Sequence, residues 1–169
     1  MKLEPLIDMP CLLTATWSRL GVHLFHGKVT TRDIDAMEQA GDAWLAKNPG
    51  RTVELVVVFP SGERMSGPER LRMARLIKRH EKIRTASATV ILAERLTGAV
   101  HRSVLTGLQL LAPPPHPAKV FGTTRAAVTW LTPHVQALCG PSAAPEALMT
   151  AVEALCARFQ ARLSKPPLA

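Results

Sequence analysis

The side chains that could do acid–base or nucleophilic chemistry in this sequence are six histidines, several serines and three cysteines. A nucleophile needs a base within hydrogen-bonding distance, so each histidine is a candidate base for Ser61, Ser66 or a cysteine. No G-x-S-x-G elbow, phosphate-binding loop, G-x-G-x-x-G or H-E-x-x-H motif is present to organise such a pair. We therefore expect no catalytic residue and interpret the histidines as surface or strand-end residues: His23, His26, His80, His101, His116 and His134.

Metal and redox chemistry are not indicated either. His23 and His26 are three residues apart in a predicted strand, so we expect them on opposite faces, where they make a poor metal pair. Cys11, Cys139 and Cys156 are an odd number at wide spacing, which is neither a disulfide framework nor a zinc signature. We expect no metal and no cofactor.

The feature most typical of a binding site is a stripe of cations. The segment from Glu63 to Arg84 contains eight Lys or Arg and three Glu, and so carries +5 of the net charge of +8. Spacings of 3, 4 and 3 place four of these cations on one face of a helix, and like charges at that spacing repel by a few tenths of a kcal/mol per pair. We predict that they bind a partner, with an ordinary solvated basic face as the alternative: Arg72, Arg75, Arg79 and Lys82.

Composition indicates one folded domain. The chain has 169 residues, of which 47% are hydrophobic and 20% charged, enough for a core without disulfides or metal. Aromatic residues make up only 4%, which speaks against an aromatic platform for bases or sugars. An acid and a proline near the start do not fit a secretory signal, and no apolar run approaches the ~20 residues that cross a bilayer. We expect a cytoplasmic protein.

Periodicity predicts strands and helices in the order β-β-α-β-α-β-α-β-α, followed by one more helix. The first two strands, at 12–17 and 22–26, form a hairpin. A T-x-x-D start at Thr30 opens the first helix, an S-x-x-E capping box at Ser66 opens the second, and Thr123 or Thr124 caps the fourth. The other strands are predicted at 53–59, 86–93 and 118–121, and the third helix at about 100–111.

Strands that alternate with helices require crossovers and a mostly parallel sheet, with the hairpin as an antiparallel edge. We expect an α/β domain over 1–138, a linker over 139–145, and an amphipathic helix and tail over 146–169. The apolar face of that last helix must be buried on the domain or on a second copy. Its apolar residues are Leu148, Val152, Leu155 and Phe159.

Two segments carry a family resemblance. The stretch 25–30 reads FHGKVT, and 120–131 reads VFGTTRAAVTWL. With the element order, they resemble the STAS domain of anti-sigma-factor antagonists and sulfate-transporter tails. The chain more closely resembles bacterial STAS-like proteins that are grouped by name with CRAL-TRIO domains. The resemblance spans about Leu12 to Val135 and implies a STAS-like α/β fold.

STAS proteins of this kind carry a phosphorylatable serine at the start of the second helix, after a motif that contains an aspartate. Ser66 holds a similar place here, but the preceding stretch, FPSGERM at 59–65, lacks that aspartate. Because Ser66 also has a capping role, we favour capping, with phosphorylation of Ser66 or Ser61 as the alternative.

These observations favour a non-enzymatic regulatory or scaffolding module that binds a protein partner, either an acidic one or a second copy of the chain. One alternative is an anion-binding module that uses the basic stripe on nucleic-acid backbone or an acidic membrane surface. Another is a small-ligand or hydrolase site in the loops at the carboxyl ends of the strands, where open α/β sheets place their ligands.

Overall fold

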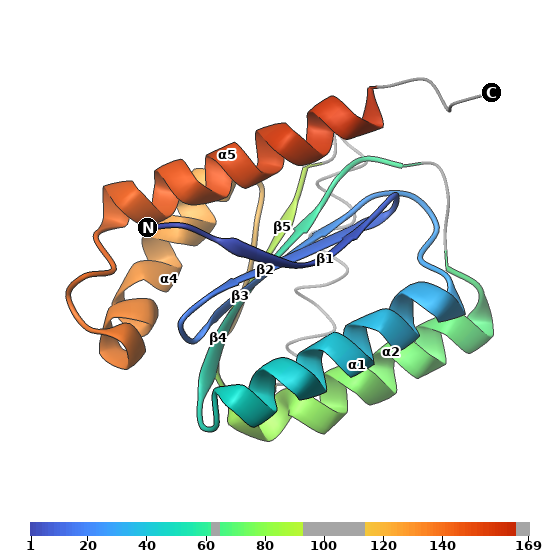
Figure 1. Cartoon of the computed structure of the whole chain (residues 1–169), viewed down its shortest axis with the longest axis horizontal. Coiled ribbons are helices and arrows are strands. Elements are labelled where there is room, and N and C mark those ends of the chain that lie inside the picture. The colour runs from blue at the N-terminus through green and yellow to red at the C-terminus, as the bar shows by residue number, and fades with distance from the viewer. Residues whose placement is uncertain (62–64, 93–113, 165–169) are drawn as a thin grey trace.

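A six-stranded mixed sheet with helices on both faces forms the protein (Figure 1). The computed structural model describes residues 1–61, 65–92 and 114–164; the predicted third helix and His101 lie outside them. Strand order in the sheet follows the chain. The first two pairs of neighbours are antiparallel and the other three are parallel, which confirms the predicted fold class. The strands are β1 (Glu4–Met9), β2 (Leu12–Trp17), β3 (Leu20–Phe25), β4 (Thr52–Val58), β5 (Arg84–Ile91) and β6 (Ala118–Phe121).

The helices begin where the capping residues predict. Thr30 and Asp33 form a complete capping box at the start of α1 (Thr31–Lys47), and Ser66 and Glu69 form another at α2 (Gly67–His80). Thr123, one of the two predicted caps, caps α4 (Thr124–Cys139). The last helix, α5, spans Pro145–Leu163. None of the described helices combines the length and apolar character needed to cross a membrane.

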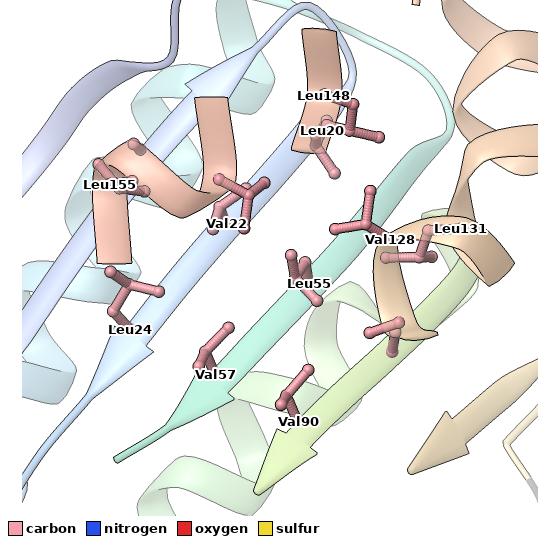
Figure 2. Packing of buried hydrophobic residues seen from close by; sticks show 14 of the residues in the cluster. Leu20, Val22, Leu24, Leu55, Val57, Val90, Val128, Leu131, Leu148 and Leu155 are labelled. Carbon is pink, nitrogen blue, oxygen red and sulfur yellow. The ribbon is translucent and has the colours of Figure 1, made fainter. Parts of the chain in front are cut away.

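The main core lies between one face of the sheet and the helices α4 and α5 (Figure 2). Because side chains alternate along a strand, every second residue of β3, β4 and β5 points into this layer. The buried strand residues meet α4 and α5 directly, as Figure 2 shows for Leu20, Val22, Leu24, Leu55, Val57, Val90, Val128, Leu131, Leu148 and Leu155.

Helix α5 packs on the sheet of its own chain. All four of its predicted apolar residues are buried in the main core, and the Phe159 ring lies 5.2 Å from the Phe59 ring, measured between centroids. Arg158 and Arg162 form ion pairs with Asp8 of β1 and so attach α5 to the edge of the sheet. The apolar face of this helix was expected to be buried on the domain or on a second copy, and the structure shows it buried on the domain. That residues 1–138 fold without α5 stays a prediction.

Strand β1 was not predicted from the sequence. It is an edge strand in which Ile7 is the one buried residue, so the alternation that marks a strand is missing. Pro5 has no backbone N–H, which fits an edge position, and the pairing with β2 is irregular between Pro5 and Ile7.

The opposite face of the sheet is packed more sparsely. Helices α1 and α2 lie side by side on it (Figure 1), and the buried apolar cluster there has four members: Val29, Ile34, Met73 and Leu76. At the other end of α1, the Arg19 guanidinium donates to the carbonyl oxygen of Asn48 at 3.3 Å. Gly50 makes room for it, because its φ is +117° and a Cβ there would lie 2.7 Å from Arg19 Nη1.

Replacing Phe159 by alanine tests how much α5 contributes to the core. Removal of a fully buried aromatic ring should lower the free energy of unfolding by about 3–5 kcal/mol, measured by urea denaturation. The neighbouring exposed Gln160→Ala should change it by less than ~0.5 kcal/mol. Equal effects of the two substitutions would show that α5 does not carry core energy.

Candidate functional sites on the helix-pair side of the sheet

Two of the four predicted partner-binding residues join α2 to α1. Arg72 pairs with Asp35, and Arg79 pairs with Glu38 and with Asp42, where Nη2 and Oδ2 are 2.8 Å apart. The charges of Arg72 and Arg79 are therefore compensated by acids of the same chain. Asp35, Glu38 and Asp42 are spaced 3 and 4 residues apart along α1. Arg72, Arg75 and Arg79 have the same spacing along α2. This equal spacing of acids and arginines is the sign in the sequence that the two helices pair.

Arg75 and Lys82 lie in different surroundings. Arg75 is exposed on α2 and makes no ion pair with any residue that the structure describes. Lys82 is exposed too, but α2 ends at His80 and Lys82 belongs to the short 3-10 turn η1 (Glu81–Ile83). The prediction that the helix and its stripe continue to Lys82 is therefore wrong, because the last turn tightens and breaks the helical spacing.

Arg75 lines a shallow hollow on the outer surface of the helix pair. Its volume is about 490 Å³. Leu71, a large apolar residue, borders it and is 55% exposed. The predicted cations that line the same hollow are Arg72, Arg75 and Arg79.

Ser66 performs the capping role that the sequence indicates. Its hydroxyl accepts from the Glu69 backbone N–H at 3.5 Å, and its own backbone N–H donates to Glu69 Oε2 at 2.7 Å. These hydrogen bonds to Ser66, the backbone one first, lower the pKa of the Glu69 carboxyl. A phosphate on Ser66 would meet that carboxylate, so the geometry favours capping. Ser61, the second candidate, is exposed.

A cavity of about 1300 Å³ lies between the sheet and the α1–α2 pair. It runs from the start of β4 to the loops after β3 and β4, where His26, Pro60 and Ser61 border it. The helices contribute mainly apolar side chains: Met37, Trp44, Met73, Leu76 and Ile77. The strands contribute apolar and polar ones: Thr14, His23, Phe25, Glu54, Val56 and Val58.

Four adjacent strands place a polar group on the cavity wall. Thr14 Oγ1 and His23 Nδ1 are 3.1 Å apart, and His23 Nε2 lies 3.7 Å from Glu54 Oε1. Glu54 Oε2 lies 2.6 Å from Nε of Arg84, whose side chain is only 7% exposed. The Arg84 guanidinium also donates to the Ile77 carbonyl oxygen at 3.3 Å, so the pair links the sheet to α2.

His23 is held in its neutral form. Burial lowers the pKa of its imidazole below 6.5; Glu54 opposes this shift, whereas Arg84 and His80 add to it. His23 and His26, which were predicted on opposite faces of one strand, both border the cavity. β3 ends at Phe25, so His26 lies beyond the strand and its alternation.

A serine–histidine pair is present at the edge of the sheet. Ser87 Oγ and His116 Nε2 are 3.1 Å apart, a distance suited to nucleophile activation. The other ring nitrogen of His116, Nδ1, is buried and has no hydrogen-bond partner among the described residues, so none of their carboxylates orients the ring. Burial also lowers the pKa of His116. Within the described residues, no three His, Cys, Asp or Glu side chains form a group that could hold a metal.

The lowered pKa of His23 predicts that the protein becomes less stable as the pH is lowered. Unfolded His23 takes up a proton near pH 6.5, whereas folded His23 does so only at lower pH, so the free energy of unfolding decreases as pH falls below about 6.5. His23→Asn should make this decrease shallower in urea denaturation between about pH 7 and pH 5. His116 contributes in the same direction to both proteins and cancels in the comparison. If the free energy of unfolding falls equally in the wild type and in His23→Asn, the proton is taken up by another group.

Arg84 and Arg72 offer a matched comparison of ion pairs. Arg84→Met leaves Glu54 without its cation in a largely buried place and should lower the free energy of unfolding by about 3 kcal/mol. Arg72→Met removes a pair whose arginine side chain is 45% exposed, which should cost at most ~1 kcal/mol. The free energy of unfolding of both variants is measured by urea denaturation. If Arg72→Met lowers it as much as Arg84→Met does, the Arg84–Glu54 pair does not act as a buried ion pair.

Comparison with known proteins agrees with this architecture. No protein-family model and no curated protein matches the chain. Among solved structures, the chain is similar to an uncharacterized protein of the DUF3478 family with a SpoIIAA-like fold from Shewanella loihica PV-4. The two share 16% identity and a TM-score of 0.56, over 78% of this chain and 96% of that one. The likeness confirms the predicted STAS-like fold.

Proposed function

We propose that the protein is a non-enzymatic regulatory module that binds a protein partner through the outer face of α2. The SpoIIAA-like fold supports a regulatory module. The observation that carries the proposed surface is Leu71, 55% exposed beside the unpaired Arg75 and the hollow between α1 and α2. Apolar contact area next to an arginine is the combination that dominates binding energy at many protein interfaces.

The pattern of charge favours a protein over a phosphate backbone or an acidic membrane as partner. Asp35, Glu38 and Asp42 already compensate Arg72 and Arg79, so α2 does not present a continuous row of free cations. Nucleic-acid binding would rest on several such cations and would weaken steeply with salt. A contact centred on Leu71 depends mainly on apolar burial and is less sensitive to salt.

The absence of catalysis is part of the proposal. The Ser87–His116 pair is the arrangement nearest to a nucleophile and base among the described residues, and no carboxylate orients its histidine. Ser66 is exposed, and its hydroxyl caps α2 by accepting from the Glu69 backbone N–H. Regulation by binding needs no such set, whereas hydrolysis does.

The double variant Leu71→Ser with Arg75→Glu tests the surface. It should leave thermal melting nearly unchanged, because exposed substitutions usually alter stability by less than ~0.5 kcal/mol. Capture of partner proteins from lysate of the source cells should fall at least tenfold, quantified by mass spectrometry. Sedimentation of the purified chain tests the second-copy alternative with the same variant.

Lys47→Glu is the matched control, since Lys47 is exposed at the end of α1 and carries the same type of charge reversal away from Leu71. It should capture the same proteins as the wild type. A folded double variant that also captures them would move the interface away from α2.

A further inference from the structure

We propose that the outer edge of β6 binds an extended, acidic segment of a partner protein, which joins the sheet as an additional strand. An acid of that segment pairs with Lys119, and an apolar side chain covers the rings of Phe121 and Trp130. This surface is separate from the one proposed on α2, because β6 and α4 form it at the edge of the sheet.

The edge of β6 presents backbone groups that no other described strand pairs with. β6 is the last strand in the order of the sheet, and β5 is its neighbour on one side. The Ser87 N–H donates to the Pro117 carbonyl oxygen at 2.9 Å, and Ser87 is in register with Ala118. In a parallel ladder, this pattern directs the N–H and C=O of Lys119 toward β5 and those of Ala118 and Val120 away from it. The backbone of these last two residues is therefore placed to pair with a further strand.

Aromatic side chains lie beside this edge, on the face of the sheet that α4 covers. Phe121 is in register with Val90, which is buried in the main core, so both side chains point to that face. The ring centroids of Phe121 and Trp130 are 5.8 Å apart, and those of Trp130 and His134 are 5.0 Å apart. All three side chains are only partly buried. An apolar side chain of an added strand would cover them, and tryptophan is enriched among the residues that dominate binding energy at interfaces.

The charge at this edge favours an acidic segment. Lys119 is exposed and points to the same face as Phe121, with its Nζ 5.5 Å from the centroid of that ring. The stretch 114–144 contains no Asp or Glu, and its other cation, Arg125, lies 3.6 Å from Glu153 of α5. Among the described residues, Lys119 forms no ion pair. An acid opposite it on an added strand completes a cross-strand pair of opposite charge, which stabilises the pairing.

The same lysine disfavours a second copy of the chain as the occupant. Antiparallel pairing of two β6 edges would bring the two Lys119 side chains to one face, directly opposite or diagonal to each other. Like charges in these positions repel, and edge lysines are a common means by which sheets avoid pairing with one another. An acidic segment of another protein turns this side chain into a favourable contact.

Binding of a synthetic peptide to the full chain tests this inference. The peptide is Thr-Glu-Thr-Leu-Thr-Glu-Thr-Leu-Thr with blocked ends, so that acid and leucine alternate on one face of a strand; the control peptide has lysine in place of each glutamate. Both are titrated into the isotope-labelled protein and followed by nuclear magnetic resonance. We expect the acidic peptide to bind at least tenfold more tightly and to shift the amide signals of Ala118 and Val120 more than those of Lys119 and Phe121. Equal affinities would overturn the acidic partner, and no binding, or shifts confined to other elements, would overturn the edge.

Two variants locate the peptide on β6, and a third is their control. Lys119→Glu should weaken binding of the acidic peptide at least tenfold and strengthen binding of the lysine peptide, because the position then attracts the opposite charge. Lys47→Glu makes the same change of net charge at the exposed end of α1 and should leave both affinities nearly unchanged. Val120→Pro removes an N–H that points away from β5 and should weaken binding several-fold in the folded protein. Equal effects of the two charge reversals would overturn the contact at Lys119, and wild-type affinity in folded Val120→Pro would overturn strand addition.

Discussion

The packing of α4 and α5 against one face of the sheet is the constraint on which the rest of this structure depends. That layer contains most of the fully buried large side chains, Phe159 among them, and it joins residues from β2 to the last helix in one cluster. Burial of apolar area is the dominant favourable contribution to folding. Because this face supplies it, the opposite face can carry groups that a tight apolar core would exclude, including the His23 imidazole and the Glu54 carboxylate.

The second face is stabilised by attachment at its ends. Arg72 and Arg79 join α1 and α2 into one unit through the acids of α1. Arg19 holds the carboxyl end of α1 through the Asn48 carbonyl, and Arg84 holds α2 through the Ile77 carbonyl. A small apolar cluster, in which Ile34 of α1 meets Met73 and Leu76 of α2, closes the layer. Val29, Met73 and Leu76 of this cluster also line the cavity.

Local signals in the sequence predicted most elements, and long-range geometry supplied what they missed. Capping at Thr30, Ser66 and Thr123 depends on residues three apart and was readable directly. Two strand-like runs, at 12–17 and 22–26, likewise predicted the hairpin, although β3 begins earlier, at Leu20. Glu54 stands inside the apolar run of a central strand, and this anomaly together with Arg84 was the available sign of a buried pair. The cavity had no comparable sign, because its existence depends on the distance between a helix pair and a sheet, which no sequence spacing encodes.

The two sides of helix α2 differ in their surroundings. Its inner side brings Met73 and Leu76 to the cavity, and its outer side presents Leu71 and Arg75. The Arg84 guanidinium donates to the Ile77 carbonyl oxygen and so links this helix to the sheet. If an occupied cavity changes the affinity of a partner for the outer side, the partner must change the affinity of the cavity by the same factor, since linkage between binding sites is reciprocal.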